Sequence, residues 1–112
     1  MILLTHAYLV PREKEDQHAR LVRRLAEVMS GLGAEFEVFE QRAAEIGSQE
    51  SATGRFVQIA RFRDQKHLQQ VQAAETSNIQ AQALIAEICE LVDMAGQQMR
   101  GTYLPGTYVS LT

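Results

Sequence analysis

The sequence predicts an α+β fold of the ferredoxin-like βαββαβ type, with a four-stranded antiparallel sheet in the order 4-1-3-2. Segments rich in β-branched and aromatic residues alternate with segments whose apolar residues recur every three or four positions. Two βαβ units follow one another, and right-handed crossovers place the first and third strands at the centre of the sheet. The length of 112 residues suits one domain spanning 1–112.

The first part of the chain predicts a strand, a helix and a second strand. Residues 2–10 are mostly aliphatic, aromatic or β-branched, and Pro11 ends them because it has no amide hydrogen for a ladder. An acidic start and an apolar stripe with helical spacing follow, up to Gly31 and Gly33, which tolerate the left-handed angles of a helix end. Residues 34–41 then alternate apolar and acidic side chains, as a strand with one wet face does.

The middle of the chain predicts a long loop and then the third strand. Residues 42–54 are mostly small and polar, which indicates a loop, and loops of this length are usually functional or mobile. Residues 55–63 carry apolar groups at both odd and even positions. This pattern is typical of a strand that is buried on both faces.

The last part predicts a broken helix and a final strand. Asp64 is placed to cap the helix, and the polar residues at 76–78 favour a break after which the helix restarts. Gly96 predicts the end of the second piece. Residues 99–111 predict the fourth strand, at an edge of the sheet, where Pro105 removes no ladder bond that a central strand would need.

The two central strands carry apolar side chains on both faces. Leu4 and Tyr8 alternate with Leu3 and Leu9, and the third strand shows the same mixture. Both helices must cover one face, so the other would lie open to water. Covering several hundred Å² of it would contribute on the order of 10 kcal/mol before association costs. We therefore predict a homodimer in which an identical subunit covers this face across a two-fold axis.

Composition excludes several classes of partner. The 11 Lys and Arg residues against 14 Asp and Glu residues give a net charge of -3, which argues against nucleic acid. The single cysteine, Cys89, cannot form an intrachain disulfide. No apolar run reaches membrane-spanning length, and the start lacks the basic region and cleavage site of a signal peptide. We therefore expect no membrane partner and a cytoplasmic location.

The layout of the second half resembles the dimeric α+β barrel superfamily, which includes antibiotic-biosynthesis monooxygenases, EthD-like proteins and stress-responsive barrel proteins. The resemblance covers about half the chain, from Phe56–Asp64 through Glu75–Ile79 to Tyr108 and Val109. In this order a strand leads into a short helix, a break rich in capping residues, a longer helix and a closing strand. The resemblance implies a barrel formed by the sheets of two subunits, with a small cavity between sheet and helices in each.

This resemblance also implies where catalysis would be found. Oxygenases and isomerases of the superfamily often carry a histidine shortly before or within the break between the helix pieces. Here residues 69–75 contain no histidine, and His67 lies earlier. The departure weakens the transfer of a monooxygenase-like or isomerase-like activity to this chain.

His6 is the candidate catalytic residue. It shares a face of the first strand with Tyr8, and its near-neutral titration would suit a general base in a cavity. The alternative is a structural histidine held by hydrogen bonds, because no carboxylate or nucleophile is spaced to complete a catalytic set.

The predicted ligand-binding set is His6, Tyr8, Arg61 and Tyr103. Arg61 in a central strand could clamp a carboxylate with two hydrogen bonds, or it could pair with an acidic residue in solvent. The tyrosines could orient a ligand with their hydroxyl groups, or they could pack at the edge of the core.

We predict no metal and no cofactor. His6, His18 and His67 match no local ligand spacing, and Cys89, near an apolar helical stripe, reads as a small hydrophobic residue. The glycines do not form a phosphate-binding loop. An acylphosphatase shares this topology, but residues 11–15 occupy the place of its glycine-rich loop.

Two functions remain open from the sequence. One is a dimeric barrel that binds a small organic acid or aromatic molecule and carries out cofactor-independent chemistry on it. The other is a non-catalytic dimerisation or regulatory module, in which the same polar groups only satisfy the core. Fold alone does not separate the two.

Overall fold

The computed structural model describes residues 1–43 and 51–112. The elements in chain order are β1 (Ile2–Leu9), the short 3-10 helix η1 (Arg12–Lys14), α1 (Glu15–Gly31), β2 (Glu35–Ala43), β3 (Ser51–Phe62), α2 (Gln65–Ser77), α3 (Ile79–Leu91), α4 (Met94–Arg100) and β4 (Leu104–Val109). The strands form one antiparallel sheet in the order β2-β3-β1-β4. This confirms the predicted α+β class and strand order, since 4-1-3-2 is the same order read from the other edge.

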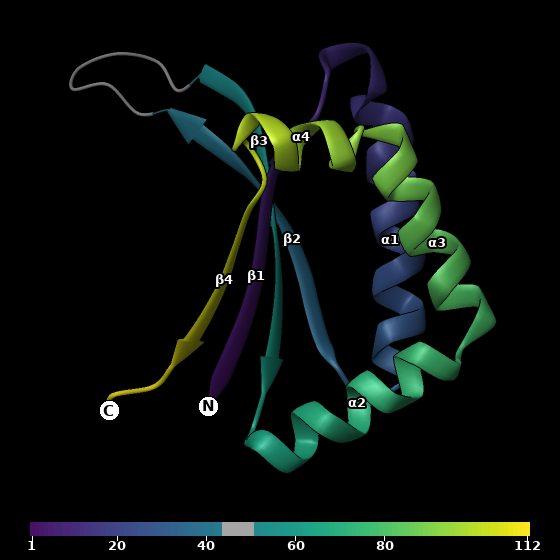
Figure 1. The fold of residues 1–112 in the computed structure, drawn as a ribbon, viewed down its shortest axis with the longest axis vertical. Coiled ribbons are helices and arrows are strands. Elements are labelled where there is room, and N and C mark those ends of the chain that lie inside the picture. The colour runs from purple at the N-terminus through teal and green to yellow at the C-terminus, as the bar shows by residue number, and fades with distance from the viewer. Residues whose placement is uncertain (44–50) are drawn as a thin grey trace.

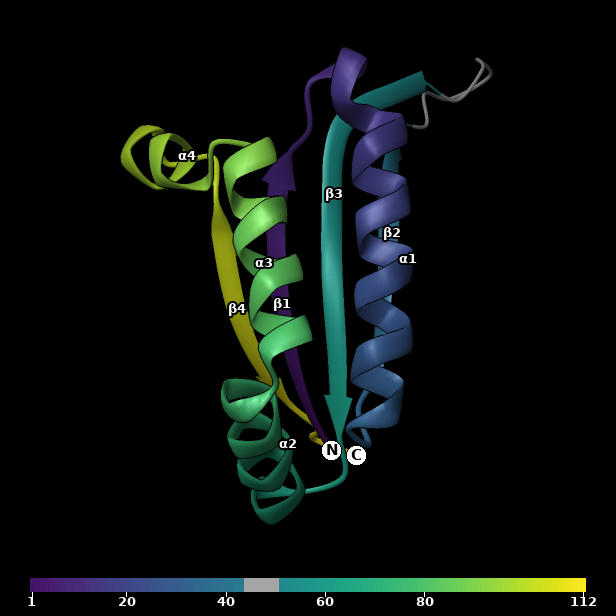
Figure 2. The same cartoon turned by 90° about the vertical axis from the view of Figure 1, so that its right-hand side faces the viewer.

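The sheet and the helices form two layers. Helices α1 and α3 lie side by side over one face of the sheet, α2 lies at one end of the molecule and α4 at the other (Figures 1 and 2). No helix of the described residues crosses the opposite face (Figure 1). In the same residues, no helix is both long enough and apolar enough to cross a membrane.

The core lies between the two layers. The predicted apolar stripe of α1 is buried there, together with residues from α3 and the end of β3. The principal buried side chains are Leu21, Leu25, Met29, Phe62, Leu84 and Ile88. A smaller cluster of Tyr8, Val10 and Val92 lies near α4. Each fully buried side chain of this size contributes roughly 2 kcal/mol through removal from water.

The hairpin between β2 and β3 corrects one prediction. The strands continue past a bulge between Glu40 and Arg42, and pair Arg42 with Ala52 and Ala43 with Ser51. The predicted loop 42–54 is therefore wrong at both ends, and its remainder, 44–50, lies outside the described residues. Small polar side chains gave no strand signal, yet ladder hydrogen bonds use the backbone and tolerate them.

The helix boundaries also differ in part from the predictions. The break is confirmed, because Asn78 caps α3 through a hydrogen bond from the Ala81 amide of 2.8 Å. Gly96 does not end the helix. The chain turns earlier, at Asp93, which has a left-handed φ of 51°, and α4 runs through Gly96. Of the two glycines predicted to end α1, only Gly33 has a positive φ.

The face of the sheet that no helix covers is largely apolar, as predicted. We call this the open face, and its apolar side chains are Leu3, Ala7, Leu9, Phe39, Val57, Ile59, Leu104 and Tyr108. Phe39 is 44%, Leu104 52% and Tyr108 58% exposed, which is unusual for residues of this size. The apolar surplus deduced from the sequence is therefore present on the surface.

Candidate functional site

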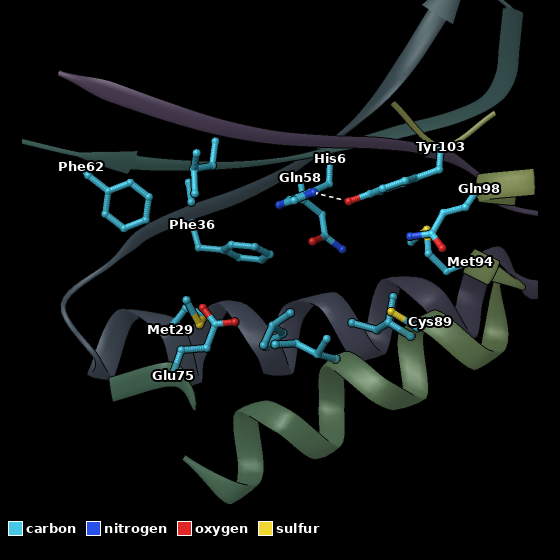
Figure 3. A pocket seen from close by; sticks show the side chains of 15 residues that line it. His6, Met29, Phe36, Gln58, Phe62, Glu75, Cys89, Met94, Gln98 and Tyr103 are labelled. Carbon is cyan, nitrogen blue, oxygen red and sulfur yellow. Dashed lines mark hydrogen bonds between the residues drawn. The ribbon is translucent and has the colours of Figure 1, made fainter. Parts of the chain in front are cut away.

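A cavity of about 340 Å³ lies between the sheet and the helices (Figure 3). Strands β1, β2 and β3 form one wall, α1 and α3 the other, and residues of α2 and α4 contribute to its two ends. Ala60 lies in the sheet wall and leaves space that a larger side chain would fill. A cavity of this volume suits a small organic molecule.

One end of the cavity is apolar. Phe36 and Phe62 project from the sheet toward Met29 of α1 (Figure 3). Glu75 of α2 also lies at this end and is the only acidic residue among the described residues that line the cavity. Partial burial raises the pKa of the Glu75 carboxyl, because the charged form loses hydration there.

The other end carries a hydrogen-bonded pair, His6 and Tyr103. The His6 Nδ1 and the Tyr103 hydroxyl are 2.6 Å apart, and the ring planes differ by 6° (Figure 3). Burial lowers the pKa of His6 and raises the pKa of Tyr103. Both rings are therefore neutral at neutral pH.

A second chain of hydrogen bonds starts at Gln58, which also lines the cavity. The Gln58 Nε2 donates to the Tyr8 hydroxyl at 2.8 Å, and that hydroxyl lies 2.6 Å from the His18 Nε2. Tyr8 is 0% and His18 1% exposed, so water does not compete for these bonds. Burial lowers the pKa of His18 to about 4. The His18 Nδ1 is buried and has no partner among the described residues.

The structure brings together only part of the predicted ligand-binding set. His6 and Tyr103 line the cavity, and Tyr8 lies behind the wall, where it holds Gln58. Arg61 is on the opposite face of the sheet, in an ion pair with Glu37. Of the two interpretations of Arg61, pairing with an acidic residue therefore matches the structure, because the side chain points to the open face of the sheet.

Among the polar residues that line the cavity, sequence reasoning missed Gln58, Glu75, Cys89 and Gln98. Gln58 was predictable in principle, because it faces His6 across the β1–β3 register. Glu75 comes just before the predicted break. Cys89 lies in the cavity wall rather than in a closed core, and burial raises the pKa of its thiol, which keeps it protonated.

The third histidine has a structural role. His67 accepts a hydrogen bond from the Arg63 amide at Nδ1, at 3.0 Å, and its Nε2 lies 2.8 Å from the Gly33 carbonyl. This places His67 at the junction of β3, α2 and the end of α1, away from His6. Across residues 1–43 and 51–112, no three histidine, cysteine or acidic side chains gather as metal ligands would.

Comparison with known proteins supports the fold. No family model and no curated protein matches the sequence. Among solved structures, an uncharacterized NIPSNAP domain protein from Burkholderia xenovorans is 11% identical, with a TM-score of 0.66 over 100% of this chain and 96% of its own. An antibiotic biosynthesis monooxygenase is 15% identical, with a TM-score of 0.65 over 100% of both chains.

A third structure extends this group. An EthD family protein from Bacillus halodurans is 17% identical, with a TM-score of 0.53 over 99% of both chains. At these identities the likeness concerns the fold and carries no activity with it. The fold implied by the resemblance is thus confirmed: this chain shares the ferredoxin-like α+β fold of these three structures.

Proposed function

We propose that this protein binds a small, uncharged organic molecule in the cavity between its sheet and helices. The observation that carries this proposal is the composition of the cavity wall. Apolar side chains surround a few polar groups, and none of the described lining residues is Arg or Lys. An organic acid would lose its hydration there without gaining a cationic partner. An aromatic or alicyclic molecule with a polar group fits this wall better.

Proton transfer by His6 is a second candidate function. A neutral histidine in an apolar cavity can act as a general base if the nitrogen that faces the substrate carries no hydrogen. For His6 that nitrogen is Nε2, because Nδ1 is hydrogen-bonded to the Tyr103 hydroxyl. Catalysis of this kind requires Nδ1 to hold the ring hydrogen, whereas a purely binding role does not.

A thermal-shift screen of uncharged aromatic compounds and their carboxylate analogues tests the proposed function. We expect uncharged compounds to raise the melting temperature of the parent as their concentration rises, since binding to the folded state stabilises it. Ala60→Leu fills part of the cavity and should remove the shift, and His6→Ala should reduce it. Gln80→Ala, at an exposed position of α3, is the control.

The screen has outcomes that contradict the proposal. If the shift is the same in Ala60→Leu, His6→Ala and the parent, the compounds bind elsewhere. If no uncharged compound raises the melting temperature of the parent, a non-catalytic dimerisation module joined through the open face becomes the better hypothesis. Such a module would still form a dimer but would bind no ligand in its cavity.

We also propose that the protein is a homodimer joined through the open face. The support is the exposure of Phe39, Leu104 and Tyr108 on a sheet face that no helix covers. A two-fold axis lets the same face cover itself. In this arrangement the helices remain outside, and the dimer leaves the cavity of each subunit on the helix side of its own sheet.

A further inference from the structure

His6 and Gln58 form a pair of neighbouring polar groups in the cavity wall. They are directly opposite each other in the antiparallel register of β1 and β3. Residues opposed in this way have Cβ atoms about 5 Å apart and point to the same face of the sheet. Both side chains extend into the cavity (Figure 3). A single planar group of a ligand can therefore meet both.

The direction of the hydrogen bond with Tyr103 decides which hydrogen-bonding group His6 presents to the cavity. The Tyr103 hydroxyl has one hydrogen, and His6 Nδ1 is its hydrogen-bond partner among the described residues, at 2.6 Å. Donation from the hydroxyl to Nδ1 uses this hydrogen and leaves the ring hydrogen on Nε2. His6 then offers the cavity an N–H donor at Nε2.

The hydrogen-bonding character of Gln58 is set by Tyr8 and His18. The Gln58 Nε2 donates to the Tyr8 hydroxyl, so the hydroxyl hydrogen is available for His18 Nε2. This orients the amide and leaves the Gln58 Oε1 without a protein partner among the described residues. Gln58 then offers an acceptor beside the His6 donor. Because Tyr8 and His18 are buried, water cannot reverse this polarity at low cost.

We propose that the His6–Gln58 pair recognises a carboxamide or lactam, with the ligand carbonyl accepting from His6 and the ligand N–H donating to Gln58. The apolar part of the ligand would lie against Phe36 and Phe62. This inference rests on the proposed function and adds a ligand class to it. An ester has no N–H for Gln58, and a carboxylate places a charged oxygen against the Gln58 carbonyl.

Calorimetric titration with 2-naphthamide, methyl 2-naphthoate and 2-naphthoate tests this ligand class. We expect the parent to bind the amide at least about tenfold more tightly than the ester, since one unmet hydrogen bond costs about 1.4 kcal/mol or more. The carboxylate should bind most weakly. Gln58→Leu should remove the preference for the amide over the ester, whereas Gln70→Leu, at an exposed position of α2, should keep it.

Two further measurements keep the inference testable if Gln58→Leu folds poorly. Tyr8→Phe leaves the cavity wall intact but removes the hydroxyl that orients Gln58, so it should reduce the preference several-fold. The ¹⁵N chemical shifts of the His6 ring report the tautomer without any ligand, and we expect the hydrogen on Nε2.

The outcomes separate the two proposals. Equal binding of the amide and the ester overturns the amide inference but leaves the proposed binding of an uncharged molecule in place. Tighter binding of the carboxylate overturns both proposals. A ring hydrogen on Nδ1 of His6 also overturns the inference, and favours the general base. If none of the three probes binds the parent, the amide inference fails. The proposed function fails as well if the thermal-shift screen also finds no uncharged compound that binds.

Discussion

Two of the three histidines in this chain are held by tyrosine hydroxyl groups. His6 pairs with Tyr103 at the cavity, and His18 pairs with Tyr8 behind it. In both pairs burial disfavours the charged imidazolium, so the rings act as neutral hydrogen-bonding groups. The difference is access, because His6 lines the cavity while His18 is 1% exposed. We therefore propose a ligand contact for His6 and a positioning role for His18.

The burial of His18 predicts an acid-sensitive fold. Its pKa falls from an ordinary 6.5 to about 4 on folding. Both states are neutral at pH 7, but below pH 6.5 the unfolded state takes up a proton that the folded state does not. The free energy of unfolding should therefore fall by roughly 2 kcal/mol between pH 7 and pH 5 on this account.

Urea unfolding of the parent and of His18→Phe at both pH values measures this effect. The variant is expected to be less stable at pH 7, because Tyr8 loses a partner, but its stability should fall less between the two pH values. Equal pH dependence in the two proteins would show that His18 is not the responsible group.

At the scale of elements, polar side chains define where helices begin and how the last helix joins the sheet. Asp64, Asn78 and Asp93 each accept a hydrogen bond from a backbone amide in the first turn of α2, α3 and α4. Gln97 of α4 is 2% exposed and reaches the end of β1. Its side chain accepts from the Leu9 amide and donates to the Leu9 carbonyl, each at 2.8 Å. Gln97 thus continues the hydrogen bonding along β1 beyond Leu104, the first residue of β4.

Removing the cap of α3 should cost a moderate part of the stability. Asn78→Ala leaves the Ala81 amide without its side-chain acceptor, and we expect the free energy of unfolding to fall by about 1 kcal/mol. Chemical unfolding at pH 7 measures the change. Gln80→Ala, two residues further along α3 and exposed, should change it by less than about 0.5 kcal/mol. Equal losses in the two variants would contradict the role of the cap.

Removing the Gln97 amide should cost more. Gln97→Leu keeps most of the volume but leaves the Leu9 amide and carbonyl unpaired, so we expect a loss of about 3 kcal/mol. Gln80→Leu, at an exposed position of α3, is the matched control. Hydrogen exchange at the Leu9 amide should also accelerate in Gln97→Leu alone. Unchanged exchange there would mean that another group replaces the lost acceptor.

At the scale of the whole molecule, the two faces of the sheet have different surroundings. One face holds the core and the cavity under α1 and α3. The other presents apolar side chains together with the Arg61–Glu37 ion pair. An exposed apolar surface of this kind usually marks an association site. The proposed dimer and the proposed ligand site therefore use opposite faces of the same strands.

A charge in the middle of the open face should separate the dimer. Ile59 lies in the central strand β3, opposite Thr5 of β1. We expect the parent to sediment as a dimer at micromolar concentration, and Ile59→Glu to sediment as a monomer, because the interface would bury an unpaired charge. Ile79→Glu is the control, since Ile79 is 87% exposed but lies at the start of α3. A monomeric parent would rule out the proposed homodimer.

Several elements of the fold were predictable from the local pattern of the sequence. The stripe of α1, the break at Asn78 and the parity of the central strands are local patterns, and the structure confirms them. The order of the strands followed from the handedness of the crossovers. The failures at 42–43, 51–54 and Gly96 have one cause: small or polar residues carry weak local preferences, and neighbouring strands or turns decide their state.

What the sequence by itself determined is the fold class, the strand order and the apolar surplus on the uncovered face, because periodicity and parity act over a few residues. The tertiary structure alone decided which polar groups meet. Tyr103 reaches His6 across 97 positions of the chain, Gln58 is oriented by a buried pair, and Arg61 faces away from the cavity. Such contacts depend on register and packing between distant segments, and these distances leave no signal in local composition.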